Sequence, residues 1–491
     1  MSDTHERGRT PPSPGTSSGG WAGLGAGAAA LAAALVIRLV LGVPSVVEVV
    51  ADLITLAVPV AVFDALLSVL GSLSKPLLVL IVAAGALGLS AAIGNLAARG
   101  AAGNQRRAVV YASIGAGALG IGVPVLLGAL ATGIANVSAV VLYTILFSRS
   151  YDPAAPIDPE TDRNRRVLLQ WGGVAGVLLL LGGGAWRLLT GGARREVAGT
   201  IPPPITPNAE FYVISKNLID PTVSTAGWTF RVDGLAESPM LLSYDEVRAL
   251  PSVEQLQTLE CISNEVGGHL ISTARWRGVT LRELLERSRP SGGVVEVKLH
   301  AEDGYTESIP LEMAADERVL VAYEMNGEPL PQAHGYPLRL LIPGVYGMKG
   351  PKWLNRVELI DAPYAGYWEQ RGWTREAIVK TMSRIDAPAS AQPLGGGPVR
   401  LAGIAYAGVR GIDRVELRIG QDDRWVEATL DQPIAELCWR FWSYEWRPQA
   451  PGTYGVTVRA IDGSGETQTA RVAPTLPDGA SGYDGTVYTV S

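Results

Sequence analysis

Cysteine and histidine are scarce: two cysteines and four histidines occur in the 491 residues. The two cysteines, Cys261 and Cys438, exclude a disulfide scaffold and any metal or iron–sulfur site that needs several thiolates. No histidine lies between residues 6 and 268. The N-terminal part therefore cannot hold a haem through membrane histidines, and C-x-x-C-H attachment is also excluded, so no haem is expected.

Basic side chains are outnumbered in the C-terminal part of the chain. Residues 1–200 contain 14 basic and 10 acidic side chains, a net of +4, whereas residues 201–491 contain 27 and 37, a net of −10. An acidic chain lacks the basic surface that phosphate backbones require, so no nucleic-acid partner is expected. His-Glu-x-x-His, Walker and Gly-x-Ser-x-Gly motifs are absent too, and no spacing supports a Ser/His/Asp site.

Charged residues are nearly missing from long apolar runs before residue 190. A membrane span needs about 20 apolar residues. Residues 1–20 are polar and are predicted to form a disordered tail, and residues 21–190 form the transmembrane region. Ser45–Ser74 contains three acidic residues and either spans or lies re-entrant, which gives five or six spans. The other predicted spans are Trp21–Val43, Pro76–Ala98, two within Ala108–Ser148 with a break near Thr132–Gly133, and Val167–Trp186.

Arginines in two short loops set the predicted orientation, because cytoplasmic loops carry an excess of positive charge. These arginines are Arg99, Arg106 and Arg107 in one loop, and Arg149, Arg163, Arg165 and Arg166 in the other. Two spans separate the loops, so both can be cytoplasmic, and the last span then places everything after it outside. We therefore predict a multi-pass protein of the cell membrane. Asn164–Gln170, before the last span, resembles a twin-arginine export signal; the alternative is two arginines that flank a helix.

Strand and helix signals are mixed after a stiff, proline-containing linker at residues 191–207. Residues 208–375 are predicted to form an α+β domain, and Ser243-x-x-Glu246 and Thr280-x-x-Glu283 are capping boxes that begin short helices. Residues 376–491 show strand alternation without helical periodicity and predict a small immunoglobulin-like β-sandwich. The predicted strands are Trp228–Asp233, Val294–Leu299, Val319–Tyr323, Pro337–Ile342, Arg356–Ile360, Arg414–Ile419 and Tyr454–Ala460.

Cys261 follows a predicted strand and precedes a pair of glycines. A lone cysteine is more often a small buried hydrophobe than a ligand, and we interpret Cys438 in that way. The surroundings of Cys261 favour a ligand. Five segments occur in order: Thr258–Gly268, Ile271–Gly278, Ala322–Pro331, His334–Arg339 and Pro343–Trp353. Together they resemble the sulfite oxidase family of molybdopterin enzymes, over about residues 205–475. The variant Cys-Ile-Ser-Asn-Glu-Val-Gly-Gly after several spans is similar to membrane-bound actinobacterial members.

The resemblance implies a molybdenum–molybdopterin cofactor, in which one pterin dithiolene holds the metal and one protein cysteine is a further ligand. The matching cysteine is Cys261. The positions that match cofactor-binding residues of the family are Asn264, His334, Arg339, Lys349 and Lys352. Cationic donors are what the phosphate of the cofactor needs. The sandwich looks like the family's C-terminal domain, so a homodimer is a further expectation.

Two positions depart from the family's pattern. Ile214 occupies the position of an arginine that helps to bind the oxyanion, and Lys216 is near but off register. Trp373 aligns with a tyrosine close to the metal, and we take Cys261 and Trp373 as the catalytic positions. A pocket without the fixed guanidinium and the phenol should hold sulfite poorly.

The sequence therefore predicts a membrane-anchored, extracytoplasmic molybdopterin oxidoreductase that transfers an oxygen atom together with two electrons. The expected substrate is an S-oxide, an N-oxide or a related small molecule, and the alternative enzyme is a sulfite dehydrogenase. A non-enzymatic membrane-tethered binding or adhesion protein is the second alternative. Electrons would be exchanged with an external partner, a quinone or a redox protein.

Reporter fusions test the topology. A reporter after Ser491 should be active outside the cytoplasm and one near Arg106 inside, because arginine-rich loops stay cytoplasmic. Activity is measured for both fusions with matched expression levels. Cytoplasmic activity of the terminal fusion would contradict the orientation.

Overall fold

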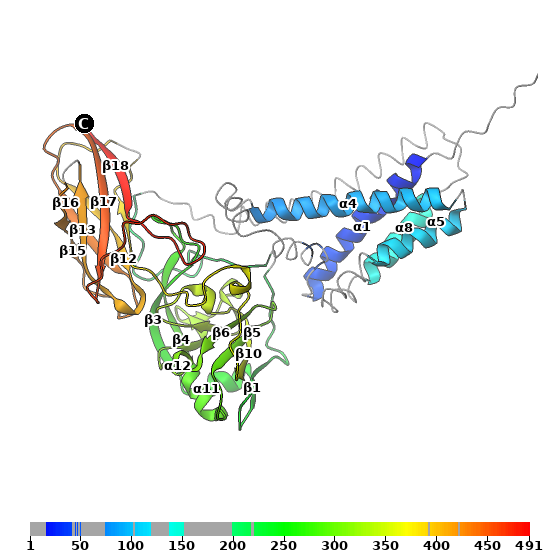
Figure 1. Cartoon of the computed structure of the whole chain (residues 1–491), viewed down its shortest axis with the longest axis horizontal. Helices are drawn as coiled ribbons and strands as arrows, with labels where there is room; N and C mark the ends of the chain where they lie inside the picture. Colours follow the sequence, from blue (N-terminus) through cyan, green and yellow to red (C-terminus); the bar gives the residue numbers. More distant parts are fainter. Residues whose placement is uncertain are drawn as a thin grey trace, which may run out of the picture. The chain divides into compact units, whose positions relative to one another are not determined.

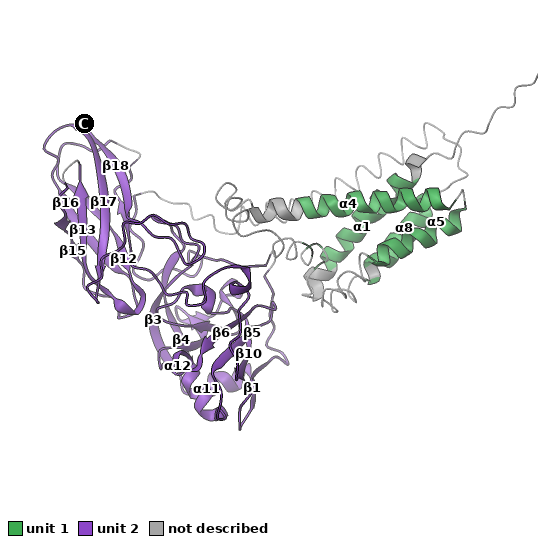
Figure 2. Cartoon of the chain, viewed as in Figure 1, with its two compact units in different colours: residues 1–193 green, residues 194–491 purple. Residues whose placement is uncertain are grey.

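The computed structural model describes residues 16–41, 45, 47, 50, 74–101, 104–118, 137–151, 199–217, 220–390, 393–420 and 423–491. The chain divides into two compact units, residues 1–193 and residues 194–491 (Figures 1 and 2). The finer domain boundaries at residues 20, 190, 207 and 375 stay predictions.

The first unit is helical and is held together by small residues. The helices described in this unit are α1 (Thr16–Leu41), α4 (Ser74–Gly100), α5 (Gln105–Gly117) and α8 (Val137–Ser150). Gly23 of α1 lies against Ser90 O of α4, and Gly94 of α4 lies against Gly19 O. The two backbones approach closely because no Cβ stands between them, which is typical of helices that pack in membranes.

Two stretches of the described helices, Gly19–Val36 and Ile81–Gly100, are long and apolar enough to cross a membrane. They overlap the predicted spans Trp21–Val43 and Pro76–Ala98. α1 begins at Thr16, so the end of the predicted disordered tail is helical. α5 and α8 lie at the two ends of the predicted pair of spans within 108–148. The predicted span at 167–186, the arginine pair before it and nearly all of 45–74 lie outside the described residues.

The second unit contains a mixed five-stranded sheet in the order β2-β1-β10-β5-β6. Its strands are β1 (Thr229–Gly234), β2 (Met240–Ser243), β5 (Glu296–Ala301), β6 (Thr306–Pro310) and β10 (Leu354–Ile360). β1 runs parallel to β10, and the other neighbours are antiparallel. The short helices of this region are α10 (Tyr244–Ala249), α11 (Leu281–Ser288) and α12 (Leu311–Ala314).

Local sequence determines where two of these helices begin. Ser243 and Glu246 form the predicted capping box of α10, since each side chain bonds the backbone of the other. Thr280 accepts a hydrogen bond from the backbone N–H of Glu283 and begins α11. α11 turns Leu281, Leu284 and Leu285 into the core that it shares with β1, β5 and β10.

A second sheet carries the predicted cysteine site. Its strands are β3 (Val253–Glu260), β4 (Ile271–Thr280), β7 (Leu320–Met325) and β8 (Glu328–Pro329) in that order, and β9 (Arg339–Leu341) pairs with β7. β3 and β4 are antiparallel, so the chain leaves β3 at Glu260 and returns at Ile271. Residues 261–270 form the connecting loop, which we call the cysteine loop.

The C-terminal region is a sandwich of two four-stranded sheets. One has the order β11-β12-β16-β15 and the other β14-β13-β17-β18. Both sheets contribute to one hydrophobic cluster, which includes Leu401, Trp442, Leu417 and Val458. The strands are β11 (Met382–Ala387), β12 (Val399–Tyr406), β13 (Ile412–Ile419), β14 (Val426–Glu427), β15 (Thr429–Leu430), β16 (Arg440–Trp446), β17 (Gly452–Asp462) and β18 (Asp484–Val490). Figure 1 shows these strands grouped apart from β1, β5 and β10.

Candidate active site

Cys261 begins the cysteine loop, directly after β3. Its backbone N–H donates to Leu270 O at 2.9 Å, which closes the loop at its base. The thiol is 7% exposed. Burial raises the pKa of the Cys261 thiol, while hydrogen bonds from the backbone and side chain of Ser263 lower it. Both Ser263 donors would stabilise a thiolate once a metal displaced the proton.

Asn264 holds the loop together from inside. Its side-chain nitrogen donates to Glu260 Oε1 at 2.9 Å, and its side-chain oxygen accepts from the backbone N–H of Leu270 at 2.8 Å. The other carboxylate oxygen of Glu260 is buried, and none of the residues that the structure describes forms a hydrogen bond with it. Burial raises the pKa of Glu260 to about 7, against the effects of Asn264 and Arg384. Asn264 therefore orders the predicted ligand loop through both ends of its side-chain amide.

Arg339, on β9, is a buried cation without an acidic partner among the described residues. The side chain is buried, and its one hydrogen bond in that set is a long one of 3.4 Å from Nη1 to His334 O. Its Nε has no hydrogen-bond partner in the described part of the chain. The guanidinium carbon lies 5.5 Å from the centre of the Trp276 ring. Burial lowers the pKa of Arg339, and Tyr212 opposes this effect only in part.

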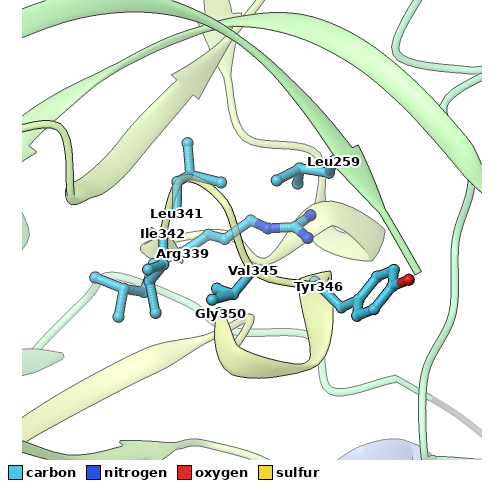
Figure 3. A pocket seen from close by; sticks show the side chains of 9 residues that line it. Leu259, Arg339, Leu341, Ile342, Val345, Tyr346 and Gly350 are labelled. Carbon is cyan, nitrogen blue, oxygen red and sulfur yellow. The ribbon is translucent and has the colours of Figure 1, made fainter. Parts of the chain in front are cut away.

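The guanidinium of Arg339 lines a small pocket, which is too narrow to hold a water molecule in this structure. Leu259 and Tyr346 lie on either side of the guanidinium in Figure 3, with Val345 and Gly350 below. Leu259 comes from the end of β3, two residues before Cys261, so the pocket and the cysteine loop share one strand end. A buried charge is costly unless it is paired, so an anionic or strongly hydrogen-bonding group beside this guanidinium would stabilise it.

His334 and Lys352 flank the same strand. His334 is buried, and its Nε2 lies 2.9 Å from Asn208 O. Burial lowers the pKa of His334 to about 4, so the ring is neutral near pH 7. Because a carbonyl can only accept, Nε2 carries the proton and Nδ1 remains an acceptor. Lys352 donates to Ala333 O at 3.0 Å.

Gly335 allows Lys352 to lie close to the turn that contains His334. Gly335 has φ +114°, and a Cβ there would lie 3.0 Å from Lys352 Cα. A larger residue would be strained and would push Lys352 away from the His334 turn (Gln332–His334).

Lys349 is buried but already paired. Its ammonium lies 2.7 Å from Glu307 Oε1 and 2.6 Å from Glu369 Oε1, and both carboxylates are buried. Glu369 also approaches Arg375 at 3.7 Å. The predicted cofactor contact of Lys349 therefore competes with two carboxylates, whereas the guanidinium of Arg339 faces no such competition. These pairs tie the turn Gly347–Lys349 to β6 through Glu307 and to the segment that follows β10 through Glu369.

The structure also places the two positions that depart from the family's pattern, Ile214 and Trp373, and the nearby Lys216. Lys216 donates to Asp303 O at 2.8 Å and to Asn217 Oδ1 at 3.0 Å, and it lies 3.7 Å from Asp303 Oδ2. Ile214 is 44% exposed. Trp373 is buried in an apolar cluster that includes Ile262, Tyr346 and Met348. The structure thus brings Trp373 into the packing beside the cysteine loop and leaves Lys216 fixed on Asp303.

Several residues of the site were not predicted from the sequence. Glu260 and Ser263 flank Cys261 within the segment that carries the resemblance, so a closer reading of that segment could have found them. Arg384, whose Nη1 donates to Gly268 O at 2.5 Å, comes from β11 more than a hundred residues later. No local pattern connects it to the cysteine loop.

Comparisons with known proteins point to one family. The family described as "Oxidoreductase molybdopterin binding domain" matches residues 217–368. The chain is 32% identical over 178 residues to the uncharacterized oxidoreductase YuiH of Bacillus subtilis, which covers 36% of this chain and 88% of that protein. It is 31% identical over 318 residues to the mitochondrial sulfite oxidase of Mus musculus, over 55% of this chain. The chain spans 58% of the length of that mouse enzyme.

One solved structure has a similar fold. The sulfane dehydrogenase SoxCD of Paracoccus pantotrophus aligns with a TM-score of 0.52 and 20% identity, over 60% of this chain and 85% of that chain. At this identity the likeness concerns the fold alone.

Two buried cations provide a matched test of the site's electrostatics. In cofactor-free protein, Lys349→Met should destabilise the fold by about 3–5 kcal/mol, because it leaves Glu307 and Glu369 buried without their cation. Arg339→Met should leave stability unchanged or raise it, since it removes a charge that no acid of the described residues compensates. Thermal unfolding followed by tryptophan fluorescence measures both. Equal loss of stability in the two variants would contradict the difference in pairing.

Proposed function

The chain belongs to the sulfite oxidase family of molybdopterin-dependent oxidoreductases, and we propose that Cys261 ligates the molybdenum of its cofactor while Arg339 binds an anionic part of the pterin. His334, Lys352 and Asn264 are proposed to complete the cofactor site, with Lys349 in a supporting position. The single observation that carries this assignment is the buried guanidinium of Arg339, which has no acidic partner among the described residues.

The residues present fit such a cofactor chemically. The pterin carries a phosphate and many hydrogen-bonding edges, and an arginine offers a planar fork of donors that matches them. Neutral His334 offers an acceptor at Nδ1, which suits a pterin N–H. Cys261 offers sulfur, a soft donor that suits transition metals.

When bound, the molybdenum cofactor supplies two-electron oxygen-atom transfer. The protein's own groups hold and orient it. Ser263 donates to the Cys261 sulfur and stabilises its anionic form, which a metal ligand must adopt. Asn264 fixes the loop around that sulfur, and Trp373 contributes an apolar wall through its cluster with Ile262 and Tyr346.

The proposed substrate is a small S-oxide, N-oxide or related compound without a full negative charge. A dianion such as sulfite needs a fixed cation beside the metal. Ile214 provides none, and Lys216 is bound to Asp303. The alternative is sulfite dehydrogenation, which the likeness to mouse sulfite oxidase favours.

The setting of the enzyme is also proposed. Two apolar helices support a membrane anchor, and the charge pattern of the loops supports an extracytoplasmic catalytic unit that exchanges electrons with a quinone or redox protein. We propose that the sandwich is immunoglobulin-like, because its strand orders correspond to the ABED and CFG sheets of that fold, with β14 added at one edge. We further propose that the sandwich takes part in homodimer formation. The catalytic unit is then exported in folded form through the twin-arginine route.

Replacing each cysteine separately tests the metal ligand. Cys261→Ser should abolish activity, because a hydroxyl is a far poorer anionic donor than a thiol at neutral pH. Pterin should be retained, since Arg339 and His334 do not depend on the sulfur. Cys438→Ser is the matched control and should leave activity nearly unchanged. Full activity of the Cys261 variant would refute the assignment.

Steady-state kinetics with two classes of substrate test the pocket. Loss of one charge-assisted contact costs about 1.5–3 kcal/mol, or roughly ten- to a hundredfold in binding. We therefore expect weak or absent sulfite oxidation and better turnover of an organic S-oxide or N-oxide with a reduced dye. Ile214→Arg should improve sulfite oxidation. Saturable sulfite oxidation by the unchanged protein with a micromolar Michaelis constant would establish the alternative.

A further inference from the structure

The strand that leads to Cys261 is held by the C-terminal sandwich. Thr258, three residues before Cys261, is fully buried and makes three contacts with that region. Its backbone N–H donates to Leu437 O at 3.0 Å, its hydroxyl accepts from the N–H of Trp439 at 2.9 Å, and its carbonyl accepts from the Tyr406 hydroxyl at 3.0 Å. The sandwich therefore fixes the end of β3 from outside the α+β region.

Arg384, on β11 of the sandwich, reaches the far side of the cysteine loop. Its side chain is 2% exposed. One arm of the guanidinium donates to Gly268 O at 2.5 Å, and Nε donates to Asp386 Oδ1 at 2.7 Å. Because a guanidinium is planar, the hydrogen bond from Nε to Asp386 also fixes the direction in which Nη1 donates to Gly268 O.

Gly268 transmits this contact to Cys261. A Cβ on Gly268 would lie 2.6 Å from Asn264 Oδ1, so its backbone packs directly against the Asn264 amide. That amide accepts from Leu270 N, and Leu270 O accepts from Cys261 N. The contacts form a continuous chain from Arg384 to the cysteine backbone.

We propose that Arg384 is a positioning residue of the active site, which holds the cysteine loop in the conformation that keeps the Cys261 sulfur buried and aimed at the cofactor. The meaning of that sulfur as a metal ligand rests on the proposed function, whereas the positioning of the loop does not. The sandwich is then a structural part of the active site in addition to any role in assembly.

The charge of Arg384 supports this role. It opposes the burial-induced rise in the pKa of Asp484, whose carboxylate lies against Gly267 in the loop. The buried cation is thus near an acidic group that packs on the cysteine loop.

Alkylation of the two cysteines in full-length, cofactor-free protein tests the proposal. Iodoacetamide is used at one fixed pH, and mass spectrometry gives a separate rate for each cysteine. Arg384→Met should accelerate alkylation of Cys261 about ten- to a hundredfold, the range expected for losing a charged hydrogen bond. Arg384→Lys should restore part of the protection. Arg447→Met, which removes an exposed arginine of the same sandwich, should change nothing.

Cys438 distinguishes positioning from general loosening. It lies between Leu437 and Trp439, whose backbones bond Thr258, so separation of the sandwich would expose it as well. Its rate should stay constant in the Arg384 variants. Equal acceleration of both cysteines, or no acceleration of Cys261, would overturn the proposal.

A milder variant and a metal measurement complete the test. If Arg384→Met does not fold, Asp386→Asn removes the carboxylate that orients the guanidinium and should accelerate Cys261 alone, by a smaller factor. No acceleration in that variant would again overturn the proposal. Molybdenum content of the unchanged protein separately tests the proposed function, because alkylation is measured without metal.

Discussion

A guanidinium buried without an acid is the constraint on which this site depends. Taking a charge out of water costs several kcal/mol unless a partner offsets the cost. Arg339 meets no carboxylate among the described residues, and its long contact with a backbone carbonyl offsets little. A bound anion would supply the missing partner, so cofactor binding and the stability of this region should be coupled.

Three other buried cations have acidic partners, so the lack of an acidic partner among the described residues is specific to Arg339. Lys349 has Glu307 and Glu369, Lys216 has Asp303, and Arg384 has Asp386. These three are used within the protein and tie distant segments together. Of these four buried cations, Arg339 is the one without a carboxylate among the described residues, while the expected oxyanion position at Ile214 carries no charge. This distribution of charge favours tight binding of an anionic cofactor and binding of a substrate with little charge.

Local patterns in the sequence predicted the local parts of the structure. The Ser243 cap and the segment around Cys261 were identified because their signals lie within a few residues. β4 was missed because Arg275, Trp276 and Arg277 do not read as a strand, yet pairing with β3 on one side and β7 on the other stabilises it. The partners of Lys349 and the reach of Arg384 depend on residues far apart in the chain, so only the folded structure could reveal them.

The most direct test of the account is X-ray absorption at the molybdenum edge of the purified, loaded protein. A dithiolene contributes two sulfur neighbours, and we expect Cys261 to add a third at a metal–thiolate distance. The Cys261→Ser variant should retain the metal with two sulfur neighbours, whereas Cys438→Ser should keep three. Identical sulfur coordination of molybdenum in the loaded wild-type protein and in the Cys261→Ser variant would contradict the central claim.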